Sequence, residues 1–167
     1  MRIMGIDPGT KAMGYGVLES NEGKTSLVDY GVLTPAASAS IGERLSYLYN
    51  GLLEIISRTQ PDAIAIEQPF VAKNARTALV IGMAQAVAIL AAANRGITAC
   101  EYTPARIKQS VANYGVSSKE QIQEMVRLWL GLSKRPEPSD AADALAVALC
   151  HLSETQLNHI LASQDKR

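Results

Sequence analysis

Four acidic side chains stand at positions where carboxylates can do chemistry. Asp7 ends the apolar run "RIMGID" and is followed at once by a Pro-Gly turn, and Glu67 ends a second apolar run, "AIAIE". In "SDAADALAVAL", Ser139 is the expected N-cap of a helix that places Asp140 and Asp143 three residues apart on one face of its first turn. Taken singly, such acids are also typical of solvated turns and of helix N-termini, where they complement the helix dipole.

Together, the four carboxylates predict a metal site. If the strands that end at Asp7 and Glu67 are parallel neighbours, as a helical crossover between them favours, both acids emerge at one edge of the sheet. Four carboxylates at one edge repel one another, and divalent cations neutralise such a cluster. Ligands that are all oxygen select hard ions, so we expect Mg²⁺ or Mn²⁺, with two ions ~4 Å apart clamping the attacking and leaving oxygens of a phosphodiester. The expected chemistry is that of a metal-dependent nuclease.

The hydrophobic pattern predicts an α/β sheet that carries these acids. Three strands joined by short turns come first, as in an antiparallel meander, and two more strands then alternate with helices. The fourth strand is apolar on both faces, as a central parallel strand would be. The predicted strands are 2–6, 12–19, 26–33, 63–67 and 97–102, and the predicted helices are 41–59, 75–94, 104–113, 118–130 and 139–161. We therefore expect a five-stranded mixed sheet, an antiparallel meander followed by parallel strands, flanked by helices.

Composition predicts one cytoplasmic domain. The 167 residues, 47% of them hydrophobic, suit a single domain over 1–162 with a short polar tail over 163–167. Sixteen basic and sixteen acidic side chains cancel, so contact with a nucleic acid must rest on local patches. The first strand begins too early to leave room for a signal peptide, and the apolar segment 78–93 is short and interrupted for a membrane span. Cys100 and Cys150 are expected to be small core residues without a disulfide.

The chain resembles the RuvC-type Holliday junction resolvases of the RNase H-like nuclease superfamily. The likeness runs through "GIDPGTKAMGYGV", "AIEQPFVAKNARTAL", "EYTPARIKQSV" and "SDAADALAVALCH", nearly the whole sequence. It implies the RNase H-like fold, with Asp7, Glu67, Asp140 and Asp143 as the catalytic, metal-binding set. It also implies a homodimer that nicks two strands of like polarity symmetrically at a four-way DNA junction, during recombination and repair, together with a branch-migration helicase complex.

Candidate DNA contacts are one aromatic side chain and several basic ones. Phe70 is the only phenylalanine, and it follows Glu67 in a predicted loop where a ring can stack on bases or wedge between them; it also matches a phenylalanine of the family. Basic residues nearby can contact phosphates, although each alone is more typical of a solvated surface. By the resemblance, two of the lysines hold phosphate near the metals. The basic candidates are Lys73, Arg76 and Arg106, and, with support from the resemblance, Lys108 and Lys119.

Residues 78–93, "ALVIGMAQAVAILAAA", leave two structural alternatives open. The segment is apolar nearly all round and rich in small residues, so it should be a helix buried on the sheet. It is either a core helix buried on every side or a helix whose second face meets a partner subunit.

Three other functions remain as alternatives. "DPGTKAMGYG" also resembles the first phosphate loop of actin-like ATPases, but those proteins bind nucleotide between two such domains and 167 residues supply one. An RNase H-like nuclease that processes ribosomal RNA precursors would share the opening motif but not the others. A junction-binding protein that does not cut would gain nothing from four mutually repelling acids.

Overall fold

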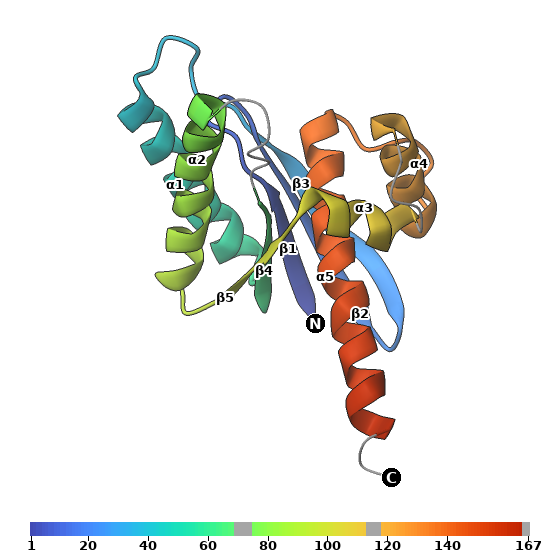
Figure 1. Cartoon of the computed structure of the whole chain (residues 1–167). Helices are drawn as coiled ribbons and strands as arrows, with labels where there is room; N and C mark the ends of the chain where they lie inside the picture. Colours follow the sequence, from blue (N-terminus) through green and yellow to red (C-terminus); the bar gives the residue numbers. More distant parts are fainter. Residues whose placement is uncertain (69–74, 113–117, 165–167) are drawn as a thin grey trace.

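The structure is a computed structural model that describes residues 1–68, 75–112 and 118–164. Every predicted strand and helix is present there, with ends shifted by a few residues at most. The strands are β1 (Arg2–Asp7), β2 (Met13–Asn21), β3 (Lys24–Leu33), β4 (Ala63–Glu67) and β5 (Thr98–Tyr102). The helices are α1 (Ile41–Thr59), α2 (Ala75–Ala93), α3 (Pro104–Ala112), α4 (Lys119–Trp129) and α5 (Ser139–Gln164), as labelled in Figure 1.

The five strands form one mixed sheet in the order β3-β2-β1-β4-β5. β1 pairs with β2, and β2 with β3, in antiparallel fashion, whereas β4 lies parallel to both β1 and β5. The predicted fold class is therefore confirmed. Ile6 pairs with Ile66, so the next residues, Asp7 and Glu67, emerge side by side at the same edge of the sheet.

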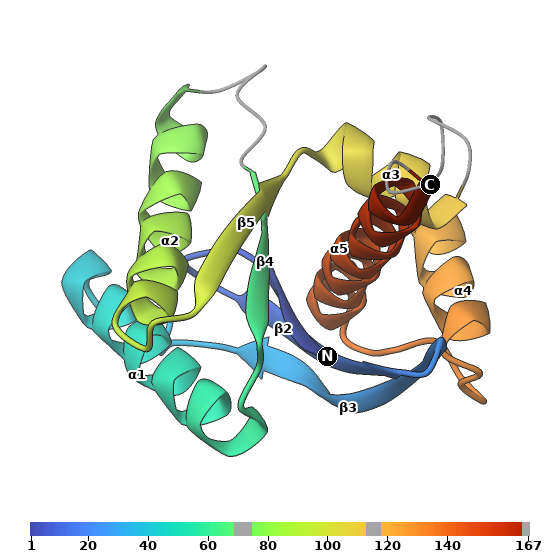
Figure 2. The same cartoon turned by 90° about the horizontal axis from the view of Figure 1, so that it is seen from below.

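Helices cover both faces of the sheet, with α1 and α2 on one side and α3, α4 and α5 on the other (Figure 2). Alternate residues of β1 supply the two hydrophobic cores: Ile3 packs under α5, while Met4 and Ile6 pack under α1 and α2. β4 is buried on both faces, as predicted for a central strand. The C-terminal part of α5 runs on beyond the sheet (Figure 1), and the helix ends at Gln164, inside the predicted tail.

α5 lies directly on the backbone of β1 and β2, because glycines face it there. A Cβ atom at Gly5 would stand 2.0 Å from the carbonyl oxygen of Ala144, and one at Gly14 would stand 2.0 Å from that of Asp140. Any side chain at these positions would push the helix away from the sheet. This close approach brings the start of α5 next to the end of β1.

The predicted N-cap of α5 is wrong by one residue. Ser139 is the first helical residue, and the carbonyl of Pro138 accepts hydrogen bonds from the backbone N–H groups of Ala141 and Ala142 at 3.0 and 3.4 Å. The backbone carbonyl at the preceding proline therefore does the work expected of the serine. Asp140 consequently lies in the first turn, and Asp143 follows just beyond it on the same face.

α2 is buried on one face only among the residues that the structure describes, so of the two alternatives left open by the sequence the core helix buried on every side is excluded. Ala84, Ala88 and Ala91 are fully buried against the sheet and α1. On the opposite face Leu79 and Leu90 are 64% and 52% exposed. Residues 76–93 of this helix have a mean hydropathy of 1.7 and, by length and composition alone, are long and apolar enough to span a membrane. This differs from the expectation that the segment is too short. Here its inner face forms one layer of the α/β fold.

Candidate active site

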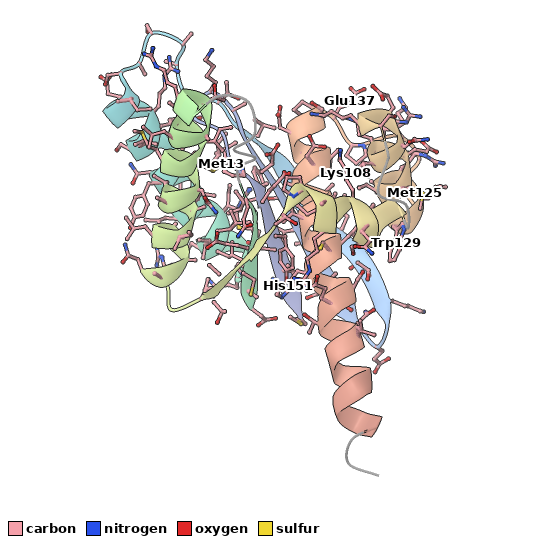
Figure 3. The ribbon with its side chains drawn as sticks, viewed as in Figure 1. Met13, Lys108, Met125, Trp129, Glu137 and His151 are labelled. Atoms are coloured by element: carbon pink, nitrogen blue, oxygen red, sulfur yellow. The ribbon has the colours of Figure 1, made fainter. Side chains whose placement is uncertain are left out.

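A cavity of about 400 Å³ opens where β1 and β4 end, beside the start of α5 (upper end of the sheet in Figure 1). Its walls combine carboxylates from three elements, lysines from the start of α4 and from α3, and apolar side chains. The lining residues are Asp7, Glu67, Asp143, Lys108, Lys119, Pro104, Ile107, Ile122 and Ala146. The structure thus brings together three of the four predicted acids and two of the predicted lysines; Lys108 is labelled in Figure 3.

Burial and mutual repulsion hold protons on two of these acids. The pKa of Asp7 is raised to about 7, first by burial and then by the negative charges of Glu67, Asp143 and Asp140. The pKa of Glu67 is also raised to about 7, again by burial first and then by Asp143. The site therefore concentrates more negative charge than these side chains can carry at neutral pH without a compensating cation.

Lys119 supplies part of that compensation. Its Nζ lies 2.7 Å from Oδ2 of Asp143, and this hydrogen bond is the main cause of the raised pKa of the lysine. Lys119 is the first residue of α4, where a capping box formed by Ser118 and Gln121 fixes the start of the helix. Lys108, from α3, also lines the cavity, and its charge opposes the rise in the pKa of Glu67.

Asp140 stands at the edge of this group. Its charge raises the pKa of Asp7, so the two carboxylates are near neighbours, yet Asp140 does not line the cavity. Within the described ranges, no three Asp, Glu, His or Cys side chains already stand at metal-coordinating spacing. The chemistry of the donor set nevertheless fits a hard divalent cation, because the described residues that line the cavity offer carboxylate oxygens and neither imidazole nor thiol.

The other DNA candidates lie elsewhere or outside the described residues. Arg106 forms an ion pair with Glu154 of α5, and its guanidinium lies 5.7 Å from the ring centroid of Tyr102, so the structure does not bring it to the carboxylates. Arg76 lines a separate cavity beside the turn after β1. Phe70 and Lys73 fall outside the described residues. The roles of these four side chains remain predictions.

The sequence analysis missed the apolar walls of the cavity. Ile107 and Lys108 follow Pro104 by three and four residues, and this spacing is the signal that places all three on one face of α3. Behind this helix, the hydroxyl of Tyr102 lies 2.8 Å from Nδ1 of His151, and both side chains are buried. This buried pair joins β5 to α5 under α3, and so helps to fix the wall that carries Lys108.

The sheet order and flanking helices are those of the RNase H-like fold. The structure of Thermus thermophilus RuvC in complex with a Holliday junction substrate superposes with a TM-score of 0.89, at 33% identity over 95% of this chain and 96% of that one. The yeast mitochondrial Holliday junction resolvase shares the fold, with a TM-score of 0.62 at 17% identity. The fold is therefore one used by DNA junction resolvases.

Sequence comparisons define the family. The family model for crossover junction endodeoxyribonuclease RuvC matches residues 3–151. The RuvC of Dehalococcoides mccartyi is 55% identical over 99% of this chain and 100% of its own length, and that of Chloroflexus aggregans is 56% identical over 90% and 92%. The chain belongs to the RuvC family of crossover junction endodeoxyribonucleases. It is accordingly a hydrolase that cleaves DNA, and the ATPase and non-cutting alternatives are set aside.

The raised pKa values predict a pH-dependent stability in the metal-free protein. The native state holds protons at Asp7 and Glu67 up to about pH 7, whereas the unfolded chain releases them near the ordinary values of 3.8 and 4.5. The unfolded state thus binds fewer protons across this window, so these two sites lower the free energy of unfolding as pH rises from about 4 to about 7.

Asp7→Asn removes one of the two titrating carboxyl groups. The free energy of unfolding of the variant should therefore fall less than that of the wild type between pH 5 and 8. Urea unfolding in EDTA at both pH values measures the difference, and Mg²⁺ should stabilise the wild type more than the variant. Parallel pH profiles for the two proteins would contradict the assignment of Asp7 to a charge-crowded site.

Proposed function

We propose that this protein resolves four-way DNA junctions by nicking two strands of like polarity symmetrically, in homologous recombination and DNA repair. One observation carries the proposal. Carboxylates from β1, β4 and α5 meet lysines from α3 and α4 in a single open cavity. The Thermus thermophilus relative, solved with a junction substrate, superposes over 95% of this chain, which supports the same substrate here.

We propose Asp7, Glu67, Asp140 and Asp143 as the ligands of two Mg²⁺ ions, for which Mn²⁺ can substitute. Bound there, the ions would activate a water molecule and stabilise the leaving oxygen of the scissile phosphodiester. The repulsion that raises the pKa of Asp7 supports this assignment, because cations relieve it. Asp140, at the edge of the site, would complete the set from the first turn of α5.

The lysines and apolar walls have separate roles in this proposal. Lys108 and Lys119 place two positive charges in the cavity with the carboxylates, where they can hold a phosphate against the site. Ile107 and Ile122 exclude water from one wall, which strengthens these charge interactions. Lys119 neutralises Asp143 when no cation is present, so its ammonium is free to turn to the phosphate once the carboxylate has another partner.

We further propose that two copies form a homodimer through the outer face of α2. Leu79, Met83 and Leu90 are exposed, and their spacing places them along one stripe of the helix. A stripe of this kind is typical of a helix that packs against a second helix. Two sites related by a two-fold axis match two cuts of like polarity on a four-way junction. By family resemblance, we also propose that the protein associates with a branch-migration helicase complex. By the same resemblance, we propose that it acts in the cytoplasm.

Carboxylate substitutions test the chemistry. Asp7→Asn, Glu67→Gln, Asp140→Asn and Asp143→Asn should each slow cutting of a labelled four-way junction in Mg²⁺ by about a hundredfold or more, because the amides keep the shape but weaken cation binding. Junction binding in EDTA should persist. Glu22→Gln, at the exposed turn between β2 and β3, is the matched control and should cut normally.

A linear duplex of the same sequence should stay intact under these conditions. A carboxylate variant that cuts at the wild-type rate would remove that residue from the set. Failure of the wild type to cut junctions would refute the proposed function itself.

Charge substitutions on α2 test the homodimer. Leu90→Glu places an unpaired charge in the proposed interface, which costs several kcal/mol once buried, so the protein should sediment as a monomer. Leu128→Glu on α4 is the matched control, since Leu128 is 55% exposed against 52% for Leu90. A dimeric Leu90→Glu protein, or a Leu128→Glu protein that dissociates, would place the interface elsewhere.

A further inference from the structure

A buried hydrogen bond behind α3 joins the strand beside Glu67 to the helix that carries the aspartates. The hydroxyl of Tyr102 on β5 lies 2.8 Å from Nδ1 of His151 on α5. The two rings meet edge to face, with centroids 5.8 Å apart, and each residue is only 7% exposed. Burial lowers the pKa of His151, so its ring is neutral at neutral pH. The bond therefore joins two neutral groups that are shielded from water.

Tyr102 is also fixed to the strand that ends at Glu67. In the parallel pairing of β4 with β5, Tyr102 stands opposite Glu67, and its carbonyl accepts a 2.8 Å hydrogen bond from the backbone N–H of Gln68. On α5, His151 lies two turns beyond Asp143, roughly 12 Å along the helix axis. The bond between Tyr102 and His151 thus ties the strands around Glu67 to the helix of Asp143.

The same tyrosine stands at the start of α3. Thr103 follows it, and the Thr103 hydroxyl caps the helix by accepting a 3.3 Å hydrogen bond from the backbone N–H of Arg106. Pro104 is the first helical residue, a position that suits its fixed φ. Lys108 lies one turn further on, in the wall of the active-site cavity. The position of Tyr102 therefore determines where the helix that carries Lys108 begins.

Apolar packing alone does not set the position of α3 along α5. Ile107 and Val111 are buried in the core that α3 shares with α5, but such contacts depend on buried area and have no preferred direction. A hydrogen bond has a preferred length and angle, so it selects one position. Arg106 and Glu154 also link the two helices, but the arginine side chain is 59% exposed, so this ion pair contributes little. The buried pair is the stronger constraint.

We infer that His151 is a positioning residue for DNA cutting, which acts through Tyr102 and α3 on Lys108. The inference rests on the proposed function, in which Lys108 holds a phosphate against the carboxylates. His151 is buried away from the cavity and does not touch DNA; it and Lys108 are labelled in Figure 3. Without the hydrogen bond α3 can shift against α5, and a displacement of about 1 Å in an active site can slow a reaction by up to about a hundredfold.

Single-turnover cutting of a labelled four-way junction in Mg²⁺, with the protein in excess, tests this role. Tyr102→Phe keeps the ring and removes only the hydroxyl, so it should cut about tenfold more slowly, while junction affinity in EDTA stays within about twofold of the wild type. His151→Phe should show the same change. His151→Asn should restore most of the rate, because its amide places a polar atom near the former position of Nδ1.

Ser153→Ala is the matched control. It removes a hydrogen bond that is internal to α5, from Oγ of Ser153 to the carbonyl of Leu149, and should cut at the wild-type rate. Thermal unfolding in EDTA verifies that each variant is folded. A variant of Tyr102 or His151 that loses stability and still cuts at the wild-type rate would overturn the inference, because the pair would then serve the fold alone.

A double-mutant cycle shows whether the effect passes through Lys108. Lys108→Ala should slow cutting by itself, and Tyr102→Phe should add little in that background, because the group that the pair positions is already absent. Equal rate losses from Tyr102→Phe in both backgrounds would overturn the inference, as would a His151→Asn protein that cuts as slowly as His151→Phe. All these outcomes differ from failure of the proposed function, in which the wild type would not cut the junction.

Discussion

The contact between α5 and the bare backbone of β1 and β2 determines the rest of the structure. A helix that meets ordinary side chains stands farther from a sheet than one that meets bare backbone, which would leave its first turn away from the strand ends. Gly5 and Gly14 remove that spacing, since even one Cβ atom there would overlap a carbonyl oxygen of the helix. The small, fully buried residues Ala141 and Ala144 complete the close fit from the helix side. Through this contact, Asp140 and Asp143 lie close enough to Asp7 to raise its pKa.

The close fit has an electrostatic consequence. Acids from three elements are forced together in a partly dry cavity, where repulsion is stronger than in water. The metal-free protein meets this cost in two ways, through protons held on Asp7 and Glu67 and through the ion pair of Lys119 with Asp143. A divalent cation can replace both the protons on these acids and the ammonium group of Lys119. The carboxylates are thus prepared for cations by the same packing that makes them repel one another.

Much of this arrangement could be predicted from the sequence, because its signals are local. Apolar runs that stop at Asp7 and Glu67, and a helical crossover between them, were sufficient to place both acids at one edge of a mixed sheet. The cap of α5 was misplaced, because a backbone carbonyl at Pro138 replaced the side chain that the pattern favoured. The ion pair of Arg106 with Glu154 and the cavity between Lys11 and Arg76 depend on residues distant in sequence. Only the packing of whole elements reveals such contacts.

The most direct test of this account is a crystal structure grown with Mn²⁺, with the ions located by their anomalous scattering. We expect two manganese peaks per chain among Asp7, Glu67, Asp140 and Asp143, with Nζ of Lys119 withdrawn from its 2.7 Å contact with Asp143. Packing of α5 on Gly5 and Gly14 should be unchanged. Manganese bound away from these carboxylates, or a Lys119–Asp143 pair that persists in a protein active under the same conditions, would contradict the account.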